Sequence, residues 1–208
     1  MQLAQMTLES FSESLAGDAP APGGGSAAAL GGALAAGLAA MVGRLTVGRE
    51  KYRSSWAAME AMTARADELR ARLLELVDAD ALAYGRVTAA YRLPRETEAQ
   101  KAERSRAVQE AFREAARIPL HTLRAAADCL ELVRAAVERG NPNCITDAGT
   151  AAELIRAAAV GAAYNVRVNL GGIRDDDFTA RLEAKARDIL GRVRREADEL
   201  AAEVESRL

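Results

Sequence analysis

Two aspartates spaced two residues apart, Asp78 and Asp80, are the residues of this sequence best suited to proton transfer. Successive residues of a helix are about 100° apart, so these two carboxylates point to nearly opposite sides. Asp78 shares its side with Asp67 and Glu75, and we expect it to be solvated. Asp80 instead lies in the middle of an apolar stripe, within about 60° of seven large side chains. These are Leu69, Leu73, Leu76, Val77, Tyr84, Val87 and Tyr91.

A lone carboxylate among apolar side chains is costly to bury unless it is paired or neutralised. Desolvation would raise the pKa of Asp80 and make it a general acid or base near neutral pH. The alternative is a structural role, in which Asp80 caps a neighbouring helix end or pairs with an arginine. The residue alone leaves both interpretations open.

A second chemical feature is a glycine-rich turn made of Gly23, Gly24 and Gly25, followed directly by Ser26. Glycines let the backbone approach another group closely, and Ser26 is expected to cap the helix that follows. The free amides at such a helix start suit a carboxylate, a phosphate or a polarised carbonyl, although a simple turn is the alternative. The turn is no P-loop or dinucleotide fingerprint, because the Lys-Ser/Thr pair and a preceding strand are missing.

A third feature is a pair of asparagines, Asn165 and Asn169, four residues apart on one face of a helix rich in Ala and Val. Buried amides need hydrogen-bond partners, from the protein or from a ligand. Two aligned amides suit the amide-like edge of a heterocycle, and they suit hydrogen bonds between helices equally well. The only histidine, His121, is expected to be structural, so no His-based triad or metal site can be drawn.

The elements that position these residues are all expected to be helices. Their approximate ranges are 3–16, 26–47, 55–93, 97–139, 146–170 and 178–208. Pro119 is expected to kink or break the fourth helix near Arg117, and Thr146 or Asp147 to cap the fifth.

The second of these helices consists almost entirely of Ala, Gly, Leu and Met. It is apolar all round, so we expect it to lie inside the protein with other helices packed closely against it. Its uncharged run of 17 residues is short for a membrane span, which needs about 20.

Composition supports one all-α domain of about six helices over residues 1–208. Hydrophobic residues make up 50% of the 208 residues but aromatic residues only 4%, which favours helices built on Ala, Leu, Val and Met. The net charge of −2 gives no excess for nucleic acid or a membrane surface. Two cysteines and no signal-peptide pattern make a reduced, cytoplasmic protein the expectation.

Five segments, taken in order, carry a resemblance to a known family. They are residues 22–26 with the Ala/Leu helix behind them, 77–80 with an aromatic at Tyr84, 93–94, 140–147, and 161–170. Together they resemble the cyclodeaminase domain of formiminotransferase-cyclodeaminase, and methenyltetrahydrofolate cyclohydrolase, which shares its fold. Arg95 stands where this family usually has a lysine.

The resemblance implies a helical homodimer that acts on a tetrahydrofolate derivative, with or without extra glutamates, and uses no metal or redox cofactor. The expected reaction is closure of 5-formiminotetrahydrofolate to 5,10-methenyltetrahydrofolate with loss of ammonia. The alternatives are the cyclohydrolase reaction in the same pocket and a non-catalytic helical dimer or folate-binding module. The resemblance assigns catalysis to Asp80, and the expected folate pocket comprises Gly23, Gly24, Gly25, Ser26, Tyr84, Asn165 and Asn169.

Overall fold

The computed structural model describes residues 2–208, and all the regular structure within them is helical. Six α-helices follow one another, so the prediction of a single all-α domain is confirmed. They are α1 (Leu8–Ala16), α2 (Gly24–Arg44), α3 (Trp56–Tyr91), α4 (Glu98–Arg139), α5 (Ile145–Leu170) and α6 (Asp176–Glu205). Three short 3-10 helices lie between or before them: η1 (Leu3–Gln5), η2 (Glu50–Ser55) and η3 (Pro142–Cys144).

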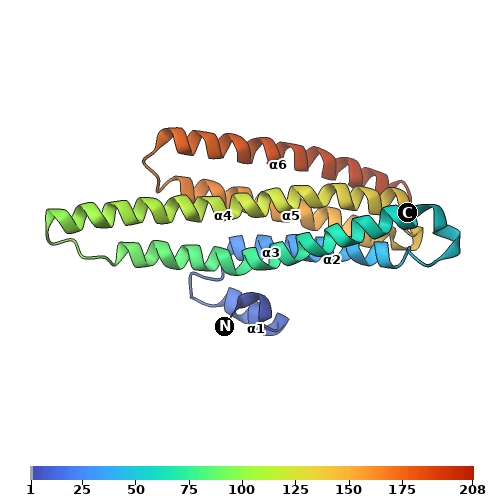
Figure 1. Ribbon diagram of the computed structural model, residues 1–208, viewed down its shortest axis with the longest axis horizontal. Helices are drawn as coiled ribbons and strands as arrows, with labels where there is room; N and C mark the ends of the chain where they lie inside the picture. Colours follow the sequence, from blue (N-terminus) through green and yellow to red (C-terminus); the bar gives the residue numbers. More distant parts are fainter. Residues whose placement is uncertain (1) are drawn as a thin grey trace.

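The helices form an elongated bundle in which α2 to α5 run along the long axis (Figure 1). Helix α6 lies along one side, against α4 and α5, and α1 lies at the opposite edge. The hairpin of α3 and α4 projects beyond the ends of α5 and α6, at the left of Figure 1. The cavities described below lie along this hairpin.

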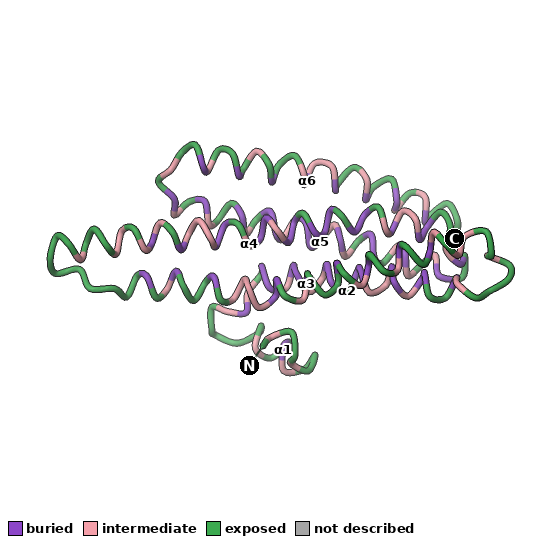
Figure 2. The backbone as a smooth tube through the Cα atoms, viewed as in Figure 1, coloured by how far each residue is buried: buried purple, intermediate pink, exposed green. Residues whose placement is uncertain are grey.

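Helix α2 lies in the interior, in contact with α3, α4 and α5 (Figure 2). Its small residues allow this close packing: a Cβ added at Gly32 would lie 3.1 Å from a Leu73 methyl carbon. By length and composition α2 could cross a membrane, but 61% of its apolar window is buried inside the bundle. The prediction of a buried core helix is therefore confirmed.

Two helix starts differ from the sequence-based predictions. The first α-helix begins at Leu8, because the Thr7 side chain accepts a hydrogen bond from the Ser10 amide and caps it. Helix α2 begins at Gly24 with Gly23 at the cap position. The prediction that Ser26 caps this helix was wrong, since Ser26 lies within its first turn.

Two further expectations about α4 and α5 need correction. Of the kink or break expected near Arg117, the break is wrong, because helix α4 continues through Pro119 to Arg139. Neither Thr146 nor Asp147 caps α5, because the 3-10 helix η3 leads directly into it.

Asp78 is not simply solvated, as was expected from its polar neighbours. It is half-buried, and its Oδ1 accepts a hydrogen bond from the backbone amide of Leu3. Asp78 therefore attaches the N-terminal segment to α3, on the other side of the helix from Asp80.

Candidate active site

The start of α2 meets the middle of α3 at Asp80. A Cβ built on Gly25 would lie 2.1 Å from Oδ1 of Asp80 and 2.5 Å from its Cγ. The carboxyl group thus occupies the space that any side chain at position 25 would fill. This close approach requires glycine at position 25.

Ser26 binds the Asp80 carboxyl group through its side chain. Its side chain is fully buried, and its hydroxyl lies 2.9 Å from the Val77 carbonyl oxygen and 3.1 Å from Oδ2 of Asp80. The hydroxyl donates towards both oxygens, so Ser26 orients the carboxyl group rather than presenting itself to a ligand.

The pKa of Asp80 is raised above the usual carboxyl value, chiefly because burial disfavours the ionised form. Hydrogen bonds from the hydroxyl and the backbone amide of Ser26 offset part of this increase. No arginine or lysine among residues 2–208 forms an ion pair with Asp80. Of the structural alternatives, pairing with an arginine is therefore wrong, whereas contact with a helix start is present.

Asp80 also faces an open cavity of about 300 Å³. The glycine turn, α3 and α5 bring together seven of the eight residues expected at the site, and Ser26 lies behind Asp80. The seven are Gly23, Gly24, Gly25, Asp80, Tyr84, Asn165 and Asn169. An acid that contacts a helix start and also adjoins a cavity is available to a bound molecule.

The two asparagines use their amide nitrogens within the protein. Asn165 Nδ2 donates to the Gly161 carbonyl oxygen at 2.9 Å. Asn169 Nδ2 donates to the carbonyl oxygens of Ala115, at 2.8 Å, and of Asn165, at 2.9 Å. Helix contacts therefore use both hydrogens of Asn169 Nδ2 and one of Asn165 Nδ2, and the amide oxygens are left as acceptors for a ligand.

Helix α4 supplies a wall of the cavity that sequence reasoning missed. Phe112 and Ala115 line it from this helix, together with Val87 and Val168 from α3 and α5. The α4 sequence shows no polar motif that would have identified this wall. Only Pro119, one turn beyond Ala115, signalled an irregularity there.

A second cavity, of about 570 Å³, lies next to the first, where the α3–α4 hairpin meets the loop after α5. The rings of Tyr91, which lines the second cavity, and Phe112, which lines the first, meet edge to face at 6.1 Å. The lining of the second cavity contains no acidic residue but four cationic ones: Arg95, Lys101, Arg104 and Arg174.

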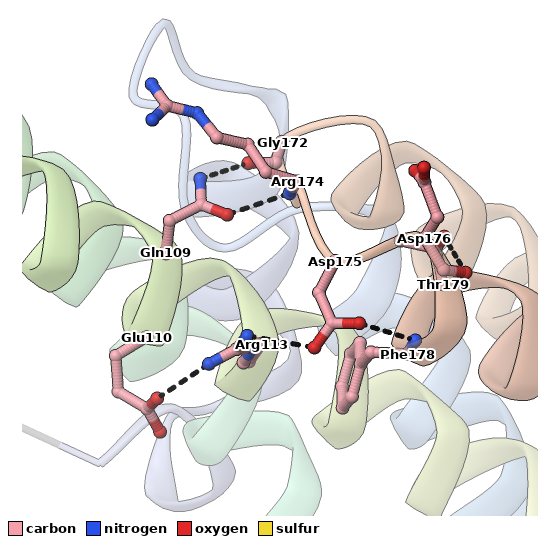
Figure 3. A network of polar contacts seen from close by, with 9 residues as sticks. All are labelled: Gln109, Glu110, Arg113, Gly172, Arg174, Asp175, Asp176, Phe178 and Thr179. Carbon is pink, nitrogen blue, oxygen red and sulfur yellow. Dashed lines mark hydrogen bonds and ion pairs between the residues drawn. The ribbon is translucent and has the colours of Figure 1, made fainter.

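Hydrogen bonds to α4 fix one wall of this basic cavity (Figure 3). Gln109 donates to the Gly172 carbonyl oxygen at 2.9 Å and accepts from the Arg174 amide at 2.8 Å. Arg113 binds the Asp175 carboxylate at 3.1 Å, and that carboxylate also caps α6. The loop carrying Arg174 is thus attached to the helix that also lines the first cavity.

Other reactive groups in the described part of the chain lie elsewhere. Cys129 and Cys144 are buried and unpaired, and burial raises the pKa of the Cys129 thiol to about 12. Residues 2–208 contain no group of three or more His, Cys, Asp or Glu side chains placed to hold a metal ion. The Asp80 cavity is therefore the best candidate for chemistry.

Comparison with known proteins gives consistent results. The family model described as formiminotransferase-cyclodeaminase matches residues 7–188. A methenyltetrahydrofolate cyclohydrolase from Methylorubrum extorquens is 39% identical over 83% of both chains. The formimidoyltransferase-cyclodeaminase of Rattus norvegicus is 31% identical over 99% of this chain, which spans 38% of that protein's length.

A solved structure agrees in fold over almost the full length. The crystal structure of formiminotetrahydrofolate cyclodeaminase from Thermotoga maritima matches with a TM-score of 0.82 and 27% identity, covering 98% of this chain and 96% of that one. The family match extends over most of the sequence and includes every residue of the Asp80 cavity. This chain therefore belongs to the formiminotransferase-cyclodeaminase family.

Proposed function

We propose that this protein is a methenyltetrahydrofolate cyclohydrolase that uses Asp80 as its general acid and base. The observation that carries the proposal is the half-buried Asp80 carboxyl group, which has a raised pKa, no cationic partner among the described residues and an adjoining cavity. The relative of 39% identity, matched over 83% of both chains, favours this reaction over the expected cyclodeaminase reaction.

In this reaction water adds to the carbon that bridges N5 and N10 of the methenyl cation. Asp80 accepts a proton from the attacking water, and one C–N bond then breaks as Asp80 returns a proton to the departing nitrogen. The hydroxyl proton of the adduct is released as the formyl carbonyl forms. Such a step needs mainly orientation and one group whose pKa lies close to the working pH.

The cavity is suited to hold a reduced pterin against Asp80. The Phe112 and Tyr84 rings provide aromatic surface, and the amide oxygens of Asn165 and Asn169 can accept from ring N–H groups. The amides of Gly24 and Gly25 at the start of α2 have no acceptor within their helix and can bind a carbonyl oxygen, whereas the Ser26 amide donates to Asp80.

The basic cavity is suited to the carboxylates of the folate tail. It adjoins the first cavity across the Tyr91–Phe112 pair, and its four cations would attract a polyanion. Replacing Arg174 with Gln is expected to raise KM more for a substrate with several glutamates than for one with a single glutamate. Equal KM changes for both substrates would contradict this assignment.

The second candidate is the cyclodeaminase reaction, which the similarity to the Thermotoga maritima enzyme supports. In that reaction N10 attacks the formimino carbon on N5, the ring closes and ammonia leaves. Asp80 would carry the proton from N10 to the departing amine. The same cavity and the same acid serve both reactions.

Supplying each folate separately distinguishes the two activities. Hydrolysis removes the absorbance of the methenyl compound, whereas deamination creates it and releases ammonia. Asp80→Asn is expected to abolish turnover while the helical circular dichroism stays unchanged, and full activity in that variant would refute the role of Asp80. We expect no metal or redox cofactor, so activity should survive dialysis against a chelator.

We further propose that two copies of the chain associate through one face of α2 and α5. Leu34, Tyr164 and Val168 are 50%, 57% and 70% exposed on these helices. Val168 also lines the Asp80 cavity, so a partner on this face would narrow its opening. Leu34→Glu is expected to be monomeric by light scattering, and a dimeric Leu34→Glu protein would exclude this face.

A further inference from the structure

Pro119 removes one hydrogen-bond donor from the middle of α4. The helix continues on both sides of it, from Glu98 to Arg139, and Pro119 itself is buried. A proline has no N–H group, so the carbonyl four residues earlier, that of Ala115, lacks its usual donor within the helix. A buried carbonyl without a donor is unfavourable and needs one from elsewhere.

The donor is a side chain that lines the proposed substrate cavity. Asn169 of α5 donates from Nδ2 to the Ala115 carbonyl oxygen at 2.8 Å, and Ala115 and Asn169 both line the cavity. A second bond runs from the same nitrogen to the Asn165 carbonyl oxygen at 2.9 Å. Both hydrogens of the amide are therefore used.

These two bonds fix which end of the amide is free. A flipped Asn169 amide would place Oδ1 against two carbonyl oxygens, which is unfavourable because none of the three can donate. No described residue donates to Oδ1 in the observed orientation. Asn169 therefore offers a bound molecule an acceptor only.

We propose that Pro119 is a positioning residue, which frees the Ala115 carbonyl to hold Asn169 so that Oδ1 accepts from a ligand N–H group. The inference rests on the proposed folate function for the choice of ligand. Alanine at position 119 would restore the N–H group, which would donate to the Ala115 carbonyl and weaken the bond from Asn169. The Asn169 amide would then be held mainly by its bond to the Asn165 carbonyl oxygen, so the direction of Oδ1 would be less tightly fixed.

The test is Pro119→Ala, assayed with the methenyl and formimino folates. KM is expected to rise about three- to tenfold, which corresponds to the loss of one positioned hydrogen bond, while kcat changes little. The thermal midpoint is expected to stay equal or to rise, because alanine suits a helix interior better than proline. A purely structural role for Pro119 predicts the opposite, a lower midpoint with no selective change in KM.

A double-mutant cycle tests whether Pro119 acts through Asn169. In an Asn169→Ala background, Pro119→Ala should raise KM no further, because the group that it positions is gone. Tyr84→Phe provides the matched control, since Tyr84 lines the same cavity from α3 and has no bond to Asn169. In the Tyr84→Phe/Pro119→Ala double variant, the fold-changes in KM of the two single variants should multiply. If the fold-changes also multiply in the Asn169→Ala/Pro119→Ala double variant, the inference is overturned.

A second readout does not depend on turnover. The sequence contains four asparagines, at positions 141, 143, 165 and 169, so selective ¹⁵N-asparagine labelling gives few side-chain amide signals. The two side-chain N–H signals of Asn169 are assigned by their loss in the Asn169→Ala variant, and their chemical shifts should change in Pro119→Ala. Unchanged Asn169 signals would overturn the inference. If the wild type converts neither folate, the proposed function fails, and this measurement still decides the role of Pro119.

Discussion

Replacing Gly25 with alanine would separate the position of the Asp80 carboxyl group from its chemistry. The added Cβ would lie 2.1 Å from Oδ1, whereas ordinary contact begins near 3.4 Å. The carboxyl group must therefore move by about 1.3 Å, the difference between these two distances. Such a movement would also disturb the bond from Ser26, although every reacting group would still be present.

The protein should lose some stability but stay folded, while the rate should fall strongly. Overpacking costs about 1–3 kcal/mol, and the better helix propensity of alanine offsets up to about 1 kcal/mol of it. A displacement of about 1 Å at a reacting group can cost about 100-fold in rate, so we expect kcat/KM of Gly25→Ala to fall by about that factor.

The assay follows the methenyl chromophore and ammonia, with thermal unfolding measured in parallel. Gly85→Ala is the matched control, because Gly85 lies on α3 near Asp80 and a Cβ there meets nothing within 4 Å. This control should be more stable by about 0.5–1 kcal/mol and keep full activity. A folded Gly25→Ala protein with wild-type kcat/KM would show that the reaction does not depend on this placement of Asp80.

Three further predictions concern the burial of Asp80 and of the two cysteines. The pKa of Asp80 is higher in the folded protein than in the unfolded chain, so the folded protein binds this proton more tightly. The free energy of unfolding therefore falls as the pH rises from the unfolded-state pKa through the folded-state pKa. Asp80→Asn should therefore unfold at a higher temperature than the wild type at pH 7, and the difference should shrink below about pH 4. Ser26→Ala removes a bond that lowers this pKa, so the acidic limb of the kcat/KM profile should move to higher pH. Cys129 and Cys144 should resist thiol reagents in the native protein and react after unfolding; labelling of the native protein would contradict their burial.

Much of the fold could be predicted from the sequence because its signals are local. Long stretches without proline, a composition poor in aromatics and a run of Ala and Gly indicate a helical bundle around a thin helix. The helical phase of Asp80 also placed it among apolar neighbours, and burial does raise its pKa. The family resemblance is confirmed by the match over residues 7–188.

The features that could not be predicted from the sequence depend on contacts between distant segments of the chain. Ser26 has the composition of a helix cap, but its hydroxyl binds two oxygens of α3, 51 and 54 residues away. Pro119 and Asn169 each attracted attention separately, and nothing in their spacing indicates that Asn169 serves the carbonyl that Pro119 leaves free. The Ala115 carbonyl, which Pro119 leaves without its usual helix donor, accepts a hydrogen bond from Asn169 of α5 instead.

The small residues of α2 also decide how the interior of this protein can be studied. Truncation to alanine, which maps the energetics of most helical proteins, removes no atoms at most buried positions of α2, because these are already Ala or Gly. Enlarging substitutions would be informative instead. At Gly32, for example, even one methyl group would press on Leu73, so α2 is best probed by adding volume.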